Sequence, residues 1–193
     1  MPIQRARTKI KRLFDRLNST SKTRGGFWSD RRATSAIEFS LFASMLTLAM
    51  VNVVDVSSYV YKRMEVGNAT EMAAQAALKA CNISSLPATT NCSGLMNAVT
   101  AAVQSTSLGT DITLQSGYPA EAYYCVNGSG ALQYVGGVNS KPADCTAAGM
   151  PNLQPHDYIE IKTTFAYEPI LSGLSVAALL TTPIAATSWM RLD

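Results

Sequence analysis

The sequence is poor in the residues and motifs on which most enzymes and metal sites depend. It contains one histidine, His156, and none of its four cysteines belongs to a CxxC pair. Zinc sites usually combine such pairs at short spacing, so no metal is expected. No nucleophile motif accompanies the neighbouring His156 and Asp157, and the two glycine pairs match no phosphate-binding loop. We therefore expect a chain that is not an enzyme and uses no cofactor.

Cysteine is absent from the first 80 residues and then occurs four times. The positions are Cys81, Cys92, Cys125 and Cys145. An even number of cysteines in one segment is typical of disulfides formed in an oxidising compartment. Of the three possible connectivities we expect Cys81–Cys92 with Cys125–Cys145, because both bonds close local loops. Four reduced, buried thiols are the alternative.

Charge of either sign is absent from Phe39 to Val54, and apolar character continues beyond Asp55 to Tyr61. The stretch from Phe39 to Tyr61 has 23 residues, and about 20 helical residues cross the hydrocarbon core of a bilayer. Asp55 lies near the far end, where we expect it to reach the headgroups. Tyr59 and Tyr61 suit an interfacial aromatic belt.

Two alternatives to a membrane span can be weighed from the same residues. A buried core helix of a soluble protein would show a polar stripe, but apolar residues occupy every face between Leu41 and Val54. A secretory signal peptide would be shorter and would end in an A-x-A site, which is missing here. We therefore predict one transmembrane helix at about 39–61.

Positive charge is concentrated before this span. Residues 1–33 hold ten Lys and Arg against two Asp, a net charge of +8, whereas the remaining 160 residues hold six against eleven, a net charge of −5. Arg31 and Arg32 stand directly before the span, and only Lys62 and Arg63 follow it closely. The positive-inside rule places the N-terminus in the cytoplasm and the C-terminal domain in the periplasm.

A carboxylate stands at the start of the apolar run. Burying an unpaired charge in lipid is costly, so such a residue is usually paired or functional; alternatively, Glu38 marks a helix start, where an acid complements the macrodipole. The order of residues resembles the processing motif of type IV prepilins, in particular the Tad/Flp branch. Ala33 precedes Thr34, and Glu38 and Phe39 would be the fifth and sixth residues after cleavage. The family prefers Gly at the position of Ala33.

This resemblance implies cleavage between Ala33 and Thr34 by a membrane-embedded prepilin peptidase at the cytoplasmic face. It also implies that the Glu38 carboxylate pairs with the freed N-terminal amine of a neighbouring subunit. Such a pair offsets two desolvation costs in the low dielectric of a helix bundle. The basic leader would hold the precursor in the bilayer until cleavage.

Further features are similar to TadE-like minor pilins. They are an acid late in the span (Asp55), an aromatic pair (Tyr59 and Tyr61), an alanine-rich segment over 64–80 and an aromatic-x-Pro turn at Tyr167. The resemblance covers residues 31–81 and, more loosely, 157–193. It implies a minor pilin or pseudopilin of a Tad-type pilus or secretion system in the bacterial inner membrane. Such a protein acts in pilus assembly or adhesion, with other pilin subunits and the Tad assembly machinery as partners.

Other interpretations share parts of this pattern. An unprocessed single-pass anchor, whose exported domain binds a ligand or partner, has the same topology and needs no cleavage. A eukaryotic type II membrane protein would carry glycans at its sequons. These are Asn68, Asn82, Asn91 and Asn127. The basic arm has the charge to bind nucleic acid, but no recognition motif accompanies it, so no nucleic-acid partner is expected.

The expected fold is α+β and pilin-like. A basic cytoplasmic leader (1–33) precedes a long N-terminal helix (34–80), and an exported disulfide-containing domain (81–193) packs a small antiparallel sheet on the C-terminal half of that helix. A short helix capped by Ser93 has inward positions at Leu95, Met96, Val99, Ala102 and Val103. Strands are predicted at 112–115, 121–126, 132–135, 158–167 and 187–191. The apolar segment 170–184 is broken by Pro183 and is expected to be packed or partner-facing.

Overall fold

The computed structural model describes residues 31–171 and 173–193. Most of the predicted cytoplasmic leader, residues 1–33, lies outside this part of the chain. The chain divides into two compact units between Ala49 and Met50. The second unit contains the sheet, both disulfides and the core, which makes the protein an α+β fold.

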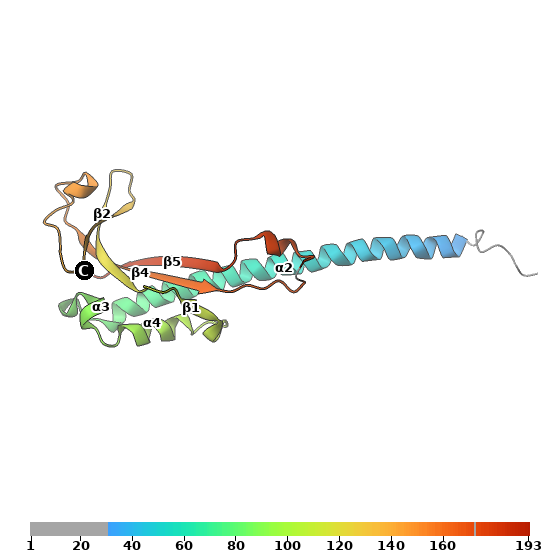
Figure 1. Cartoon of the computed structure of the whole chain (residues 1–193), viewed down its shortest axis with the longest axis horizontal. Helices are drawn as coiled ribbons and strands as arrows, with labels where there is room; N and C mark the ends of the chain where they lie inside the picture. Colours follow the sequence, from blue (N-terminus) through green and yellow to red (C-terminus); the bar gives the residue numbers. More distant parts are fainter. Residues whose placement is uncertain (1–30, 172) are drawn as a thin grey trace, which may run out of the picture. The chain divides into compact units, whose positions relative to one another are not determined.

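A single long helix, α2 (Arg31–Ala80), runs through both units, as Figure 1 shows in blue to green. It confirms the predicted helix and begins slightly earlier. Up to Ala49 its described side chains are exposed, except Ala43, which is half-buried. The hydroxyls in this part return to the helix backbone: Ser40 donates to Ile37 O, Ser44 to Leu41 O and Thr47 to Ala43 O, each at 2.8 Å. The polar groups of these three residues are thus satisfied within the helix, as a hydrocarbon environment requires.

The second unit is built around one central strand of an antiparallel sheet. The strands are β1 (Ile112–Leu114), β2 (Ala120–Val126), β3 (Leu132–Gly137), β4 (His156–Phe165) and β5 (Ile184–Arg191). One edge of β4 pairs with β1 and β2, and the other edge pairs with all of β5, from Tyr158 to Phe165. All five predicted strands are therefore present, with shifted ends.

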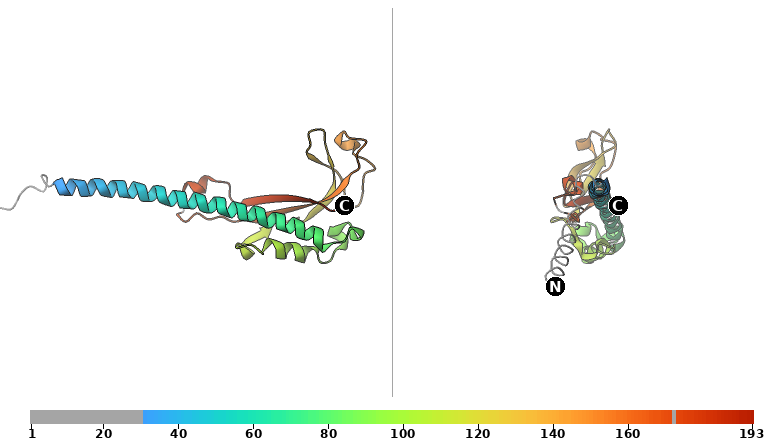
Figure 2. Two further views of the ribbon diagram at one scale, coloured as in Figure 1. Left: turned by 180° about the vertical axis from the view of Figure 1, so that it is seen from behind. Right: turned by 90° about the vertical axis from the view of Figure 1, so that its right-hand side faces the viewer.

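The core lies between β4 and the second half of α2 (Figures 1 and 2). Every second residue of β4 is buried, as expected for the strand predicted at 158–167, where apolar and charged residues alternate. Ile159 and Ile161 are fully buried, in one cluster with small side chains of the helix such as Ala69 and Ala73. Small side chains let the helix approach the sheet closely. Thr70 and Thr163 share a buried hydroxyl hydrogen bond of 2.6 Å across this contact.

A short helix, α4 (Leu95–Val103), lies next to α2 and contributes side chains to the same core. Leu95, Val99 and Val103 are buried, as predicted. Two details of the prediction are wrong. The N-cap position belongs to Gly94, which offers no side-chain cap, and Met96 is 51% exposed. The register of the amphipathic face is correct, but Met96 lies at its solvent edge.

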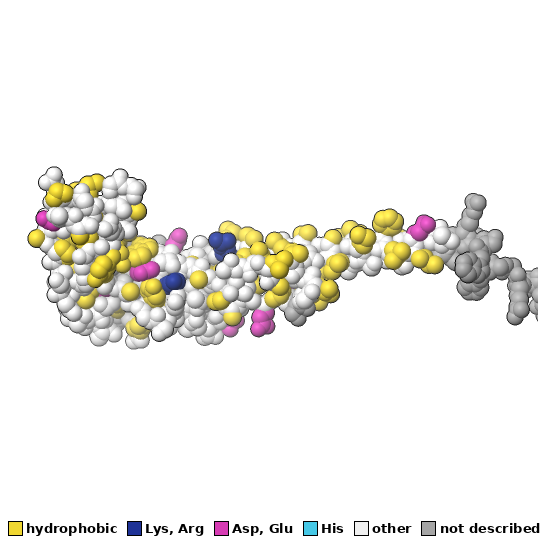
Figure 3. All heavy atoms as spheres, turned by 45° about the horizontal axis from the view of Figure 1, so that its top comes forward, with side chains coloured by type: hydrophobic (Ala, Val, Ile, Leu, Met, Phe, Trp, Pro, Cys, Tyr) yellow, Lys and Arg dark blue, Asp and Glu magenta, His cyan; other side chains and the backbone are white. Residues whose placement is uncertain are grey.

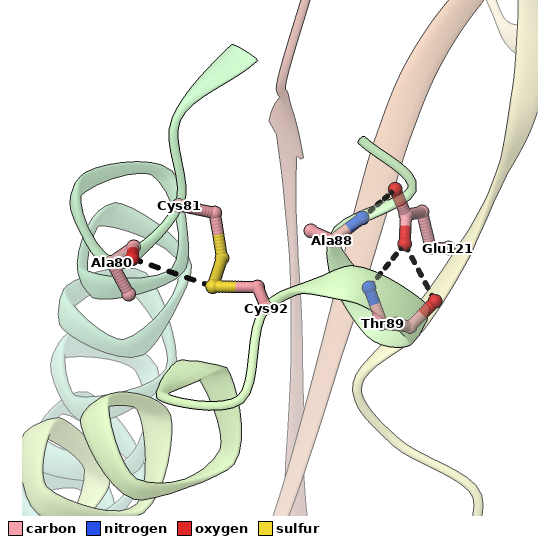
Figure 4. The surroundings of a disulfide bond; sticks show 6 residues. All are labelled: Ala80, Cys81, Ala88, Thr89, Cys92 and Glu121. Atoms are coloured by element: carbon pink, nitrogen blue, oxygen red, sulfur yellow. Dashed lines mark hydrogen bonds between the residues drawn. A yellow bond between two sulfur atoms is a disulfide. The ribbon is translucent and has the colours of Figure 1, made fainter. Parts of the chain in front are cut away.

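Both predicted disulfides are present, Cys81–Cys92 and Cys125–Cys145. In Figure 4 the first joins the C-terminal end of α2 to the residue that follows α3 (Ala88–Asn91). On the opposite side of α3, the Glu121 carboxylate of β2 accepts hydrogen bonds from Ala88 N at 2.7 Å and from Thr89 N at 2.6 Å. The connection between α2 and α4 is therefore held at two points.

Removal of the first disulfide should lower stability measurably. In the double variant Cys81→Ser with Cys92→Ser, the unfolded chain gains the freedom of a short loop, which corresponds to about 2–4 kcal/mol. We expect a lower midpoint of thermal unfolding in detergent, followed by circular dichroism. Treatment of the unmodified protein with a reductant supplies the control: the double variant should lose less stability on reduction than the unmodified chain. Equal midpoints for variant and parent would contradict the prediction.

Candidate functional site: the apolar helix and its junction

The predicted processing residues lie in the first turns of α2. Residues Arg31 to Ala33 form its first turn, so the predicted scissile bond, between Ala33 and Thr34, is at the very start of the described chain. Thr34 and Glu38 are exposed, and their spacing of four residues places them on one face of the helix. Phe39 is 74% exposed.

The position of Glu38 within the helix tests the alternative that this acid only marks a helix start. Among the described residues α2 starts at Arg31, and Glu38 lies beyond the first described turn. The favourable interaction with the macrodipole fades within the first turn of a helix. A helix-start role therefore explains Glu38 poorly, and the residue still needs a partner or a function.

Apolar side chains cover the first part of α2. The large exposed ones are Ile37, Phe39, Leu41, Phe42, Met45, Leu46, Leu48, Met50, Val53 and Val54. Figure 3 shows such side chains along the helix up to the residues drawn in grey. The helix is long and apolar enough to cross a membrane once, and the most apolar stretch is not buried against the rest of the protein. The chain is thus suited to a single-pass anchor.

The far end of the predicted span has a different role from the one expected. Asp55 is fully buried rather than directed to headgroups: its Oδ1 accepts a hydrogen bond from Ile170 N at 2.9 Å, and its backbone carbonyl accepts one from the Tyr167 hydroxyl at 2.9 Å. One turn earlier, Asn52 Oδ1 accepts a hydrogen bond from Val176 N at 2.7 Å. These bonds attach a loop of the C-terminal domain to α2.

The aromatic pair of the span is also divided. Tyr59 is 6% exposed and donates a hydrogen bond to Thr181 O at 2.9 Å, with its ring edge-on to Tyr167. It is therefore not an interfacial residue, whereas Tyr61 is 58% exposed and remains suitable for one. The spacing of Asn52, Asp55 and Tyr59 by three and four residues, which places them on one face, is the sequence signal for this attachment. Periodicity does not reveal what that face contacts.

The two basic residues beyond the span have different surroundings. Lys62 pairs with Glu65 at 3.7 Å and lies over the Phe165 ring at 6.0 Å. Arg63 is exposed. Together with Tyr59 it borders a small cavity of about 160 Å³ under the segment that leads into β5.

A second cluster of charged groups lies at the other end of β4. The buried Asp157 faces Glu121, and its backbone N–H donates to Asp193 Oδ1 at 3.0 Å. Burial and the negative charge of Glu121 raise the pKa of Asp157 to about 7, while Lys141 opposes the rise. His156 Nδ1 lies 3.3 Å from Asp193 Oδ1. Within residues 31–171 and 173–193, no group of three or more His, Cys, Asp or Glu is placed to hold a metal.

This cluster predicts an unusual dependence of stability on pH. Between about pH 4, where an exposed Asp titrates, and about pH 7, the folded state holds a proton on Asp157 that the unfolded state has released. The free energy of unfolding should therefore fall as pH rises through this window. Asp157→Asn should flatten the profile and raise stability at pH 8 relative to the parent. Urea titrations at pH 5 and pH 8 measure both effects, with the exposed Asp111→Asn as control; an unchanged slope in Asp157→Asn would contradict the assignment.

Comparisons of the chain with protein-family models, with curated proteins and with solved structures found no match. The resemblance to prepilins therefore rests on the junction residues and on the span that follows them. The described residues place those features at the start of an exposed apolar helix. A function drawn from them is a proposal that needs its own test.

Proposed function

We propose that this chain is a minor pilin or pseudopilin of a Tad-type pilus or secretion system. The observation that carries the proposal is the junction: Ala33, Thr34, Glu38 and Phe39 stand in register at the start of α2, with Glu38 exposed beyond the first turn. In this role the chain is a substrate of a prepilin peptidase and a structural subunit, with no catalytic residue of its own. It acts in pilus assembly or adhesion.

The proposed topology is a single pass through the bacterial inner membrane. The +8 charge of residues 1–33 keeps the N-terminus in the cytoplasm. The domain after the span is then periplasmic, and two disulfides are compatible with that oxidising compartment. Charge and cysteine usage are independent properties of the chain, and both favour the same orientation.

Assembly would use the exposed part of α2. Its apolar side chains, among them Phe42 and Met45, require either lipid or the helices of other pilins around them. Cleavage after Ala33 removes the basic leader, so the helix is free to move from the bilayer into a growing bundle. There the Glu38 carboxylate pairs with the amine of Thr34 on a neighbouring subunit. The pair neutralises both charges in a medium where either alone is unfavourable.

The decisive experiment is N-terminal sequencing of the protein isolated from cells that contain a Tad-type prepilin peptidase. We expect the mature chain to begin at Thr34 and to lose the mass of residues 1–33. Ala33→Leu should block cleavage, because a bulky side chain hinders access to the scissile bond. Ala6→Leu, the same substitution within the leader, is the matched control and should be processed normally. A start at Met1 or Pro2 in the unmodified protein would refute processing.

A second candidate function follows from one departure from the prepilin pattern, the Ala33 that replaces the preferred Gly. In this alternative the chain is an unprocessed anchor, and its exported domain binds a ligand or an envelope partner. The same sequencing experiment separates the two. Retention of the leader in peptidase-positive cells favours the anchor, whereas a start at Thr34 excludes it.

A further inference from the structure

The loop between β4 and β5 presents an unusually apolar surface. We call the described residues 170–171 and 173–180 the apolar loop. Its exposed side chains include Ile170 at 65%, Leu174 at 63%, Val176 at 51% and Leu179 at 87%. No charged residue occurs between Glu168 and Arg191. Solvent-facing loops are usually polar, so this surface needs a partner of apolar chemistry.

The outward direction of these side chains is fixed by the polar groups of the loop. Val176 N and Ile170 N bond to Asn52 and Asp55 of α2. The Ser175 hydroxyl caps the short 3₁₀ helix Val176–Leu179 by accepting a bond from Ala177 N at 3.1 Å, and Ala177 is fully buried. Polar groups of the loop are thus directed inward and its leucines outward, the inverse of a water-exposed loop.

The attachment points lie at a defined height on the helix. About 20 residues of helix cross the hydrocarbon core, so a span that begins at Phe39, directly after Glu38, ends near Ser58. A span that ended at Val51, before Asn52, would be too short. The helix from Phe39 to Val51 is only about 20 Å long, at 1.5 Å per residue, whereas the hydrocarbon core is about 30 Å thick. Asn52 and Asp55 therefore fall within the thickness of the bilayer, where their side chains would be costly if they faced lipid.

We propose that the apolar loop is a second membrane-contacting element, which inserts into the acyl chains of the outer, periplasmic leaflet beside α2. It covers the Asp55 side chain completely and the Asn52 side chain in part, and it presents leucines to the surroundings instead. A shallow groove of about 300 Å³, lined by Asn52, Val53, Val56, Ser57 and Val176, offers a mainly apolar surface to an acyl chain. This inference rests on the proposed membrane insertion of α2. It adds that lipid acyl chains cover the exposed side chains of the apolar loop.

The test uses the full chain reconstituted in phosphatidylcholine–phosphatidylglycerol vesicles, at a low protein-to-lipid ratio. A thiol-reactive environment-sensitive fluorophore is attached to Leu179→Cys and, as a second position, to Leu174→Cys. Phe42→Cys reports the span, and Ser129→Cys, in the exposed turn between β2 and β3, reports the aqueous domain. Vesicles with brominated acyl chains quench only fluorophores that contact the hydrocarbon.

We expect the labels at Leu174 and Leu179 to lose more than half of their fluorescence in brominated vesicles, as Phe42 does, while Ser129 stays unquenched. Quenching at Phe42 without quenching at either loop position would overturn the inference and leave the membrane span intact. A blue-shifted loop signal that bromine does not quench, and that grows with the protein-to-lipid ratio, would overturn it in favour of a second copy of the chain. Absence of quenching at Phe42 would refute the membrane span itself.

Discussion

Glu38→Ala is expected to abolish incorporation of the protein into pili while its membrane insertion and disulfides remain normal. The physical reason is the low dielectric of a helix bundle, in which the amine of a neighbouring Thr34 would lose its only counter-charge. Removal of one partner from a buried ion pair costs about 3–5 kcal/mol, which weakens association by more than a hundredfold. Fractionation of sheared pili from membranes, followed by detection of the protein in each, measures the effect.

Two controls make this result specific. Ser44→Ala removes a hydroxyl that donates to the helix backbone at Leu41 O, and it should assemble as the parent does. Glu38→Gln keeps the shape of the side chain and removes its charge, so it should fail like Glu38→Ala. Normal assembly of both Glu38 variants would favour the unprocessed anchor over the pilin.

Ile161→Ala is expected to destabilise the C-terminal domain by about 2–5 kcal/mol. Ile161 is fully buried at the centre of β4, in one core cluster with the alanines of α2. Those alanines are too small to fill the cavity that the substitution creates, and the backbones on both sides are held by strand pairing and helix geometry. A single domain is stable by only about 5–15 kcal/mol, so this substitution removes a large share of the total.

Urea unfolding in detergent, followed by the fluorescence of Trp189 on β5, measures this loss. Lys162→Ala is the matched control, because it lies one residue further on the opposite face of β4, with its amine near the Tyr118 ring. It should change stability by about 1 kcal/mol or less. A comparable loss in both variants would mean that strand propensity, not core packing, governs this position.

The elements of this fold follow from local pattern to a large extent. The strict alternation of Ile159 and Ile161 with charged residues identifies β4, and the uncharged run with its alanine-rich continuation identifies α2. The disulfides could be paired because each closes a short loop. These signals come from residues that are close together in the sequence, so they can be recognised without the structure.

The contacts that could not be predicted are those between distant segments. Asp55 accepts hydrogen bonds from the Tyr167 hydroxyl, 112 residues away, and from Ile170 N, 115 residues away. Asn52 accepts one from a backbone N–H 124 residues away. Glu121, which belongs to β2, accepts a hydrogen bond from the first residue of α3. In the sequence Asp55 is only an acid in an apolar run, and the headgroup interpretation is reasonable until a buried partner is known. The junction is a different case, because Ala33 to Phe39 were identified by resemblance and their role stays a prediction.

The hydroxyls of Ser40, Ser44 and Thr47 have a consequence for any bundle built on α2. Since each donates its proton to its own backbone, these hydroxyls can still accept a hydrogen bond from a neighbouring helix but have no proton to donate to it, so they constrain the axial position of that helix only weakly. The alignment of subunits would then depend on one charged point near the end of the helix. A slip by a single helical turn, about 5.4 Å, would separate Glu38 from its partner and be rejected. One carboxylate would thus set the axial repeat of the whole filament.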